Sequence, residues 1–269
     1  MITQREISRT AFRTNKQDRV IEKDYVITWL LLEIADSPLA KLLAFKGGTA
    51  LKKIYFSDYR FSEDLDFTVT GESPDDEILK LLTQISLTLE TEVAITARIN
   101  ENKTDRGSST LTVYLDFVGP LQGALGSRDI KMDFTLKEEL VLPLNSRDIL
   151  ALFSDCDSLH RPLNVYSLEE ILTEKLCALI GRTEPRDLYD AHFLLGLGNL
   201  DYQSIPHAFT AKASSKGIDP GKLSGVLQER EATISRLWDN RLALQVDSLP
   251  PIERVLRETK RALRKIRLV

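Results

Sequence analysis

The sequence predicts an α+β protein: a mixed sheet with flanking helices in the first half, followed by an α-helical second half. Two observations predict this. Apolar and polar residues alternate in three segments between positions 93 and 136, which is typical of strands that bury one face. Beyond Tyr166 the apolar residues recur three and four positions apart, with helix start signals at Ser167 and Pro185.

The first half alternates between helical and strand-like patterns. Ser73 is a suitable N-cap and Pro74 suits the first helical position, so a helix is expected to open there. The expected elements, in order, are a helix over 20–35, a short buried strand over 42–45, a helix over 49–56, a strand over 65–69, the helix opened by Ser73-Pro74, and strands over 93–99, 111–117 and 129–136.

The second half is expected to be helical. Ser167-Leu168-Glu169-Glu170 forms a capping box for a helix to about Gly181, and Pro185 opens another that Gly196 ends. Helical pieces follow Pro206, and the last helix starts after Pro250-Pro251. We therefore expect two domains, residues 1–150 and 151–269.

Charge and composition narrow the functional classes. The net charge is −4, so no overall field attracts nucleic acid. Residues 250–269 nevertheless carry seven Lys or Arg against two Glu, a local charge of +5, which suits either a polyanion or a solvated helix face. The two cysteines, Cys156 and Cys177, have no zinc spacing. No apolar run is long enough for a membrane span, so a cytoplasmic protein with no membrane partner is expected.

The segment FKGGTALKKIYFSDYRFSEDLDF, residues 45–67, carries the chemistry. Gly47-Gly48-Thr49 lies between an expected strand and an expected helix, where glycine lets the backbone approach a phosphate closely. Asp64 and Asp66 are two apart, so on a strand both face the same side. Two such carboxylates repel each other unless a cation lies between them, and Mg²⁺ prefers oxygen ligands. An ordinary turn beside a solvated acidic loop is the simpler alternative.

A third carboxylate from a neighbouring strand would complete a two-ion site. Asp133 is the best candidate, because apolar residues flank it within a strand pattern. Asp116, in Tyr114-Leu115-Asp116-Phe117, is the competing choice.

These residues carry a resemblance. Gly47-Gly48-Thr49, then Asp64-Leu65-Asp66, then Asp133 resembles the nucleotidyltransferase fold of DNA polymerase β and its relatives, although the fifteen residues between the glycines and Asp64 exceed the commonest spacing. More narrowly, FKGGTALKKIY and RFSEDLDF resemble the AbiEii/AbiGii-type toxin family, which includes the MenT toxins. The second half adds an independent match in Lys175, Arg182, Arg186, Asp187 and Asp190.

The resemblance implies a metal-dependent nucleotidyltransferase toxin of a toxin-antitoxin or abortive-infection system. It would transfer NMP from an NTP to an RNA acceptor, the tRNA 3′ end, with Mg²⁺ or Mn²⁺ and a cognate AbiEi-type antitoxin. The implied metal ligands are Asp64, Asp66 and Asp133. The implied catalytic residues are these three with Lys175, Asp187 and Asp190. The implied nucleotide-binding residues are Gly47, Gly48, Thr49, Lys52, Arg60, Ser62, Lys175, Arg182 and Arg186.

Two alternatives remain open at this point. The acceptor could be a protein or a small molecule such as an antibiotic, because the transfer chemistry is the same. The chain could also be an inactive nucleotide-binding module, although Asp64 and Asp66 argue against that. The sequence does not select the nucleotide, choose between Asp187 and Asp190, or give the oligomeric state.

Overall fold

The computed structural model describes residues 1–71 and 75–269. The chain divides into two compact units, one of residues 1–138 and 145–165, the other of residues 139–144 and 166–269. The expected boundary at residue 150 lies inside the first unit. The reason is that β8 (Pro162–Val165) pairs with β1 (Leu43–Lys46) and so belongs to the sheet. The chain passes from one unit to the other after Glu138, Leu144 and Val165.

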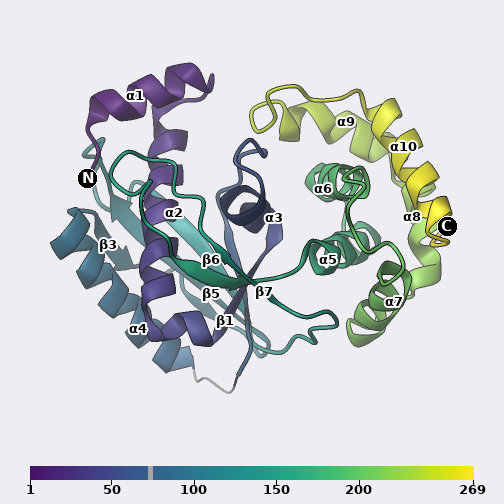
Figure 1. The fold of residues 1–269 in the computed structure, drawn as a ribbon, viewed down its shortest axis with the longest axis horizontal. Helices are drawn as coiled ribbons and strands as arrows, with labels where there is room; N and C mark the ends of the chain where they lie inside the picture. The colour runs from purple at the N-terminus through teal and green to yellow at the C-terminus, as the bar shows by residue number, and fades with distance from the viewer. Residues whose placement is uncertain (72–74) are drawn as a thin grey trace. The chain divides into compact units, whose positions relative to one another are not determined.

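Within the described residues, the first unit holds one mixed sheet of eight strands (Figure 1). The strand order is β3-β5-β6-β2-β1-β8-β7, with β4 paired to β5. β2 runs parallel to β6 and β1 runs parallel to β8, while the other pairs are antiparallel. Besides β1 and β8, the strands are β2 Leu65–Val69, β3 Thr96–Ile99, β4 Asp105–Arg106, β5 Thr110–Val118, β6 Asp129–Thr135 and β7 Asn145–Asp148.

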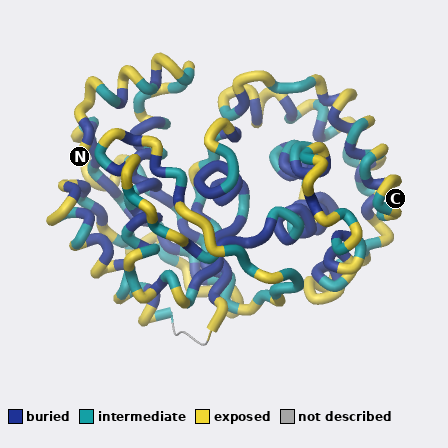
Figure 2. The backbone as a smooth tube through the Cα atoms, in the orientation of Figure 1, coloured by how far each residue is buried: buried dark blue, intermediate teal, exposed yellow. Residues whose placement is uncertain are grey.

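The two faces of this sheet differ in chemistry. Residues of β5 and β6 alternate between buried and half-buried along each strand (Figure 2). On the apolar face, Phe67 lies between Phe45 and Phe134, with ring centroids 5.1 Å and 5.5 Å away. The opposite face carries polar side chains, among them Asp66 and Asp133. The alternation thus fixes one face for the core and leaves the other for chemistry.

The helices of the first unit confirm most expected positions. The expected helix over 20–35 is α2, Asp18–Asp36, which packs against α4, Asp75–Thr88 (Figure 1). Ser73 and Pro74, the expected start of α4, lie outside the described residues. The expected helix over 49–56 divides into α3, Gly47–Ala50, and a π turn over Leu51–Tyr55. The remaining helical segments are α1 Gln4–Arg13, a 3₁₀ turn Pro38–Lys41 and a π turn Leu89–Val93.

The described part of the second unit contains helices and no strand. Ser167 is the N-cap of α5, and its hydroxyl accepts the Glu170 N–H at 3.2 Å, which confirms the first half of the expected capping box. The Glu170 carboxylate instead accepts the Leu142 N–H and binds Lys212. The helices are α5 Leu168–Gly181, α6 Pro185–Leu195, α7 Ile205–Ser215, α8 Leu223–Glu229, α9 Glu231–Leu242 and α10 Ile252–Lys265, with a 3₁₀ turn over Pro220–Lys222. Among the described residues, no helix combines the length and apolar character that a membrane span requires.

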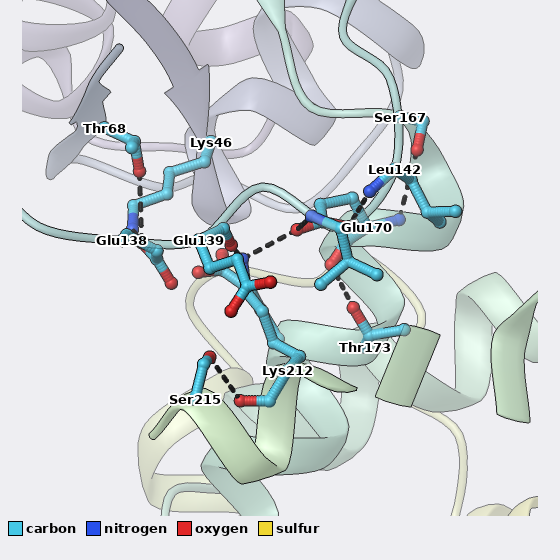
Figure 3. A network of polar contacts seen from close by, with 12 residues as sticks. Lys46, Thr68, Glu138, Glu139, Leu142, Ser167, Glu170, Thr173, Lys212 and Ser215 are labelled. Carbon is cyan, nitrogen blue, oxygen red and sulfur yellow. Dashed lines mark hydrogen bonds and ion pairs between the residues drawn. The ribbon is translucent and has the colours of Figure 1, made fainter. Parts of the chain in front are cut away.

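Buried charges explain why the chain changes unit after Glu138 (Figure 3). In the first unit, Glu138 binds Lys46 and accepts the Thr68 hydroxyl at 3.0 Å. In the second unit, Lys212 donates to the Glu139 carbonyl at 2.9 Å and to Glu170 at 2.6 Å. Lys212 and Glu170 are both fully buried, where a charge is tolerated only with a partner. Consecutive residues are therefore anchored to different units.

Candidate active site

The Gly-Gly-Thr turn is fitted closely to the strand that carries the acids. Gly47 has φ of +80°, which favours glycine, and a Cβ there would lie 3.1 Å from Cγ of Asp66. A Cβ at Gly48 would lie 2.6 Å from Nη2 of Arg60. The Thr49 hydroxyl donates to the Asp64 carbonyl at 2.5 Å. The glycine turn therefore lies directly against the Asp66 side chain and the Asp64 backbone.

Asp66 and Asp133 are neighbours across the sheet. In the parallel pair β2–β6, Asp66 is in register with Asp133, and in the antiparallel pair β1–β2 it is opposite Lys46. Neighbouring strands lie about 4.8 Å apart, so the two carboxylates share one face at close range. Asp64 precedes the first residue of β2 and is half-buried.

Asp116 is not the neighbour of Asp66. It lies on β5 in register with Asp129, whereas Thr112 of the same strand is in register with Asp133. Its carboxylate accepts the side-chain amide of Asn100 at 2.9 Å. Four strand residues span about 13 Å, which separates Asp116 from the Asp66–Asp133 pair. Asp133, and not Asp116, is therefore the carboxylate beside Asp66.

Asp133 is held from two sides. The Thr112 hydroxyl donates to its Oδ1 at 2.7 Å, and the Lys131 ammonium donates to its Oδ2 at 2.5 Å. Burial alone would lower the pKa of Lys131, but the hydrogen bond and charge of Asp133, with the charge of Asp64, outweigh it and raise that pKa. Lys131 is therefore a firmly charged cation within the acidic group.

The cations between the turn and the acids are mostly buried. Arg60 is 4% exposed and lies against Gly48, together with Ser62, whose Oγ is 3.2 Å from the position of a Gly48 Cβ. Lys52 is 8% exposed and lies 4.0 Å from the centre of the Phe61 ring. The Thr49 hydroxyl is committed to the Asp64 carbonyl. Arg60 and Ser62 are thus the side chains next to the glycine turn, while Lys52 packs under Phe61.

The residue types here suit a divalent cation, since carboxylate oxygens come from two neighbouring strands and Gly47 leaves room for the Asp66 carboxylate. Within residues 1–71 and 75–269, however, no three or more His, Cys, Asp or Glu side chains are arranged to hold a metal ion. At Asp133, Thr112 and Lys131 engage both carboxylate oxygens. An ion there would compete with Lys131.

A second charged cluster lies in the second unit. The Lys175 ammonium is 3.0 Å from Asp187 Oδ1 and 2.8 Å from Asp190 Oδ2, and both aspartates are buried. Arg182 binds both oxygens of Asp187, at 2.7 Å and 3.1 Å, although its side chain is 60% exposed. Lys175 on α5 thus holds two acids of α6.

Burial and charge oppose each other at Asp187. Burial alone would raise its pKa, but the charge of Lys175 and the hydrogen bonds from Arg182 and Lys175 outweigh it and lower that pKa. Asp190 is buried against Lys175, and Arg186 lies 3.9 Å from Glu184.

A helix-opening Gly-Gly turn beside two in-register strand carboxylates, on a mixed sheet, is the arrangement expected of a nucleotidyltransferase. The family model described as "Nucleotidyl transferase AbiEii toxin, Type IV TA system" matches residues 29–264. The chain therefore belongs to the AbiEii family of nucleotidyltransferase toxins of type IV toxin-antitoxin systems, which implies an NTP substrate and an antitoxin partner.

Solved structures share this fold. MenT4, the nucleotidyltransferase toxin Rv2826c from Mycobacterium tuberculosis H37Rv, is 19% identical with a TM-score of 0.62, over 99% of this chain and 100% of that chain. JHP933 from Helicobacter pylori is 16% identical with a TM-score of 0.55, over 93% of this chain and 92% of that chain. Among curated proteins, none matches.

Several residues that support the acids are not among those predicted from the sequence. Lys131 and Thr112 both bind Asp133, and Lys46 lies opposite Asp66 with its ammonium on Glu138. One signal was available for Lys131, because it is two residues from Asp133 on an expected strand and must share its face. Thr112 and Glu138 could not be found without the strand register and the course of the chain after β6.

Proposed function

We propose that this protein transfers NMP from an NTP to an RNA hydroxyl, the 3′ end of a tRNA, with release of pyrophosphate, at the turn and acids of the first unit. The observation that carries the proposal is the register of Asp66 with Asp133, next to a turn whose two glycines bear no side chain. Nucleotidyl transfer needs negative side chains for cations and positive groups for a triphosphate. The acids would supply the first, and Arg60, which packs on Gly48, would supply the second.

Each residue has a proposed role. Asp64, Asp66 and Asp133 would hold Mg²⁺ or Mn²⁺, which when bound neutralises phosphate oxygens and favours attack by the acceptor oxygen. Gly47, Gly48 and Thr49 would cradle the phosphates, with Arg60 and Ser62 beside Gly48 as the side-chain contacts. Asp133 would take up the proton of the acceptor hydroxyl. Lys52 would act by supporting Phe61.

We infer that the second-unit cluster takes part in nucleotide binding, as the family resemblance implies. Arg182 is the exposed cation of that cluster, so it would neutralise triphosphate charge, with Arg186 as a further contact. Lys175 is fixed between Asp187 and Asp190, so the two acids would set its position.

The proposed RNA contact is the exposed face of α10. Arg257, Arg261 and Arg264 are exposed on one side of this helix, while Ile252, Val255 and Leu263 are buried on the other. These three arginines have no ion-pair partner among the described residues, unlike Arg254, which binds Glu258 at 2.9 Å. Free guanidinium groups at helical spacing suit a row of phosphates. The reaction would take place in the cytoplasm, under control of an AbiEi-type antitoxin.

The direct experiment incubates the purified protein with Mg²⁺ and each labelled NTP in turn, together with total RNA or total protein, and with Asp66→Asn as control. Label on RNA, absent with the control, supports the proposal. Label on protein would show that the acceptor is a protein and not RNA. Label equal in wild type and Asp66→Asn would contradict the assignment of the site.

A further inference from the structure

One cation of the acidic group has no role in the reaction described above. Lys131 is on β6, two residues before Asp133, and its ammonium donates to Asp133 Oδ2 at 2.5 Å. Its side chain is 36% exposed and that of Asp133 is 24% exposed, so this pair lies at the surface of the polar face of the sheet. In register, Lys131 is opposite Tyr114, and Asp133 is opposite Thr112.

The position of Lys131 follows from the fold. A strand places residues two apart on the same face, so any side chain at position 131 points to the side where Asp133 lies. That face also holds Asp66, in register with Asp133. Two carboxylates on neighbouring strands repel each other, and a cation beside them relieves that repulsion. Lys131 therefore stabilises the folded acidic group.

The same ammonium stands in the way of a metal ion. A divalent ion held by Asp66 and Asp133 needs a carboxylate oxygen of each. The oxygens of Asp133 are engaged by Thr112, a neutral donor, and by Lys131, a positive one. A hydroxyl can remain bound to a carboxylate that also binds a metal, whereas a positive charge repels the ion. Lys131 is the group that must yield.

We propose that Lys131 is a resident counter-ion that competes with the divalent ion for Asp133, stabilising the acidic group before the ion binds and weakening ion affinity. This rests on the proposed metal role of Asp66 and Asp133. It makes Lys131 a positioning residue whose effects on stability and on ion binding have opposite signs. A residue that merely supported the fold would not raise ion affinity when removed.

The matched control is a second Lys–Asp ion pair, whose aspartate lies on the same strand as Asp133. Lys103 binds Asp129 at 2.6 Å, and Asp129 is the first residue of β6, four positions from Asp133. Lys103→Met therefore removes a Lys–Asp ion pair of the same kind from the same strand, at a distance from Asp66. Lys131→Arg keeps the positive charge and should keep the competition. Lys131→Gln repeats the test with a polar side chain if Lys131→Met folds poorly.

The experiment measures Mn²⁺ binding by electron paramagnetic resonance, without nucleotide, and urea unfolding in EDTA. Lys131→Met and Lys131→Gln should raise Mn²⁺ affinity on the order of tenfold and lower the urea midpoint in EDTA. Lys103→Met and Lys131→Arg should leave the affinity within about twofold of wild type. Unchanged or weaker Mn²⁺ binding by Lys131→Met, with normal binding by wild type, would overturn the competition and leave the metal site intact. Wild-type protein that binds no Mn²⁺ would overturn both.

Discussion

Asp66 and Asp133 occupy the same register position on two neighbouring parallel strands, β2 and β6. Each strand alternates, so their partners along the strands, Phe67 and Phe134, stack on the opposite, apolar face. The stack that closes the core therefore also fixes the two carboxylates beside each other. This relationship leads to predictions for each group around the acids.

The choice of third acid can be tested with two asparagine variants. Asp133→Asn should lower nucleotidyl transfer on the order of 10²–10³-fold, because it removes a charge next to Asp66. Asp116→Asn is the matched control, since Asp116 is also half-buried on the same face but pairs with Asn100. It should leave transfer within about twofold of wild type. A larger loss in Asp116→Asn than in Asp133→Asn would make Asp116 the third acid.

An alanine substitution in the glycine turn should have two effects, backbone strain and crowding of Asp66, which can be measured separately. Gly47 and Gly126 have φ of +80° and +85°, so alanine at either position should cost about 1–2 kcal/mol of unfolding free energy. At Gly126 the nearest atom to a Cβ is 3.8 Å away, whereas at Gly47 a Cβ would press on Asp66. Gly47→Ala should therefore lose more stability than Gly126→Ala in urea unfolding, and should also lower transfer about tenfold or more. Equal losses of unfolding free energy in the two variants would mean that the Asp66 side chain moves away from the added Cβ at no cost, and would contradict the crowding.

Lys175 should be worth more to stability than Arg182, although both bind Asp187. Lys175→Met leaves Asp187 and Asp190 buried without their shared cation, which typically costs about 3–5 kcal/mol. Arg182→Met removes a side chain that is 60% exposed, so about 1 kcal/mol or less is expected. Chemical unfolding of both variants at pH 7 measures this difference. Similar losses would mean that the buried pairs contribute no more than an exposed one.

The acid side of the stability profile should depend on Asp187. Its pKa is lowered in the folded protein, so the pairing contributes fully above the unfolded pKa, about 3.9, and is lost as pH falls through the folded pKa. The difference in unfolding free energy between wild type and Asp187→Asn should be constant from about pH 7 to pH 5 and shrink below about pH 4. Urea unfolding across this range checks it, and a difference that grows toward low pH would reverse the sign.

The exposed arginines of α10 should govern RNA binding. Replacing Arg257, Arg261 and Arg264 with glutamine should weaken tRNA binding and reduce the slope of log K against log salt by about 2, because up to three phosphate contacts are lost. The matched control replaces Arg5, Arg9 and Arg13 of α1, three exposed arginines at helical spacing in the first unit. Equal losses of tRNA affinity in the two triple variants would mean that tRNA responds to the total charge of the protein and not to the exposed face of α10.

Local patterns were enough to predict much of this molecule. The strand positions of Asp66 and Asp133 followed from alternation, and the start of α5 followed from the Ser167 cap. The pairing register of the strands could not be predicted from the sequence. Hydrogen bonding between distant segments decides whether Asp133 or Asp116 lies beside Asp66. For the same reason the unit boundary was misplaced, since β8 joins the sheet by pairing with β1.

The burial of charged side chains also could not be predicted from the sequence. Lysine and arginine are usually exposed to solvent. In this structure, however, the side chains of Lys52, Arg60 and Lys175 are buried. A charged residue is expected to be exposed unless its partners are known. The partners of Lys175 are on the next helix, α6, and cannot be identified from the residues around Lys175. Periodicity gave the face of α5 but not what covers it.

The central claim, that the Asp66–Asp133 site transfers NMP to an RNA 3′ hydroxyl, is tested most directly with intact and periodate-oxidised tRNA. The measurement is the rate at which label from an NTP enters each RNA, with Asp66→Asn as the background. The account predicts label on intact tRNA, and label at the level of Asp66→Asn on oxidised tRNA. Equal labelling of the two RNAs above that background would place the transfer elsewhere on the acceptor and contradict the account.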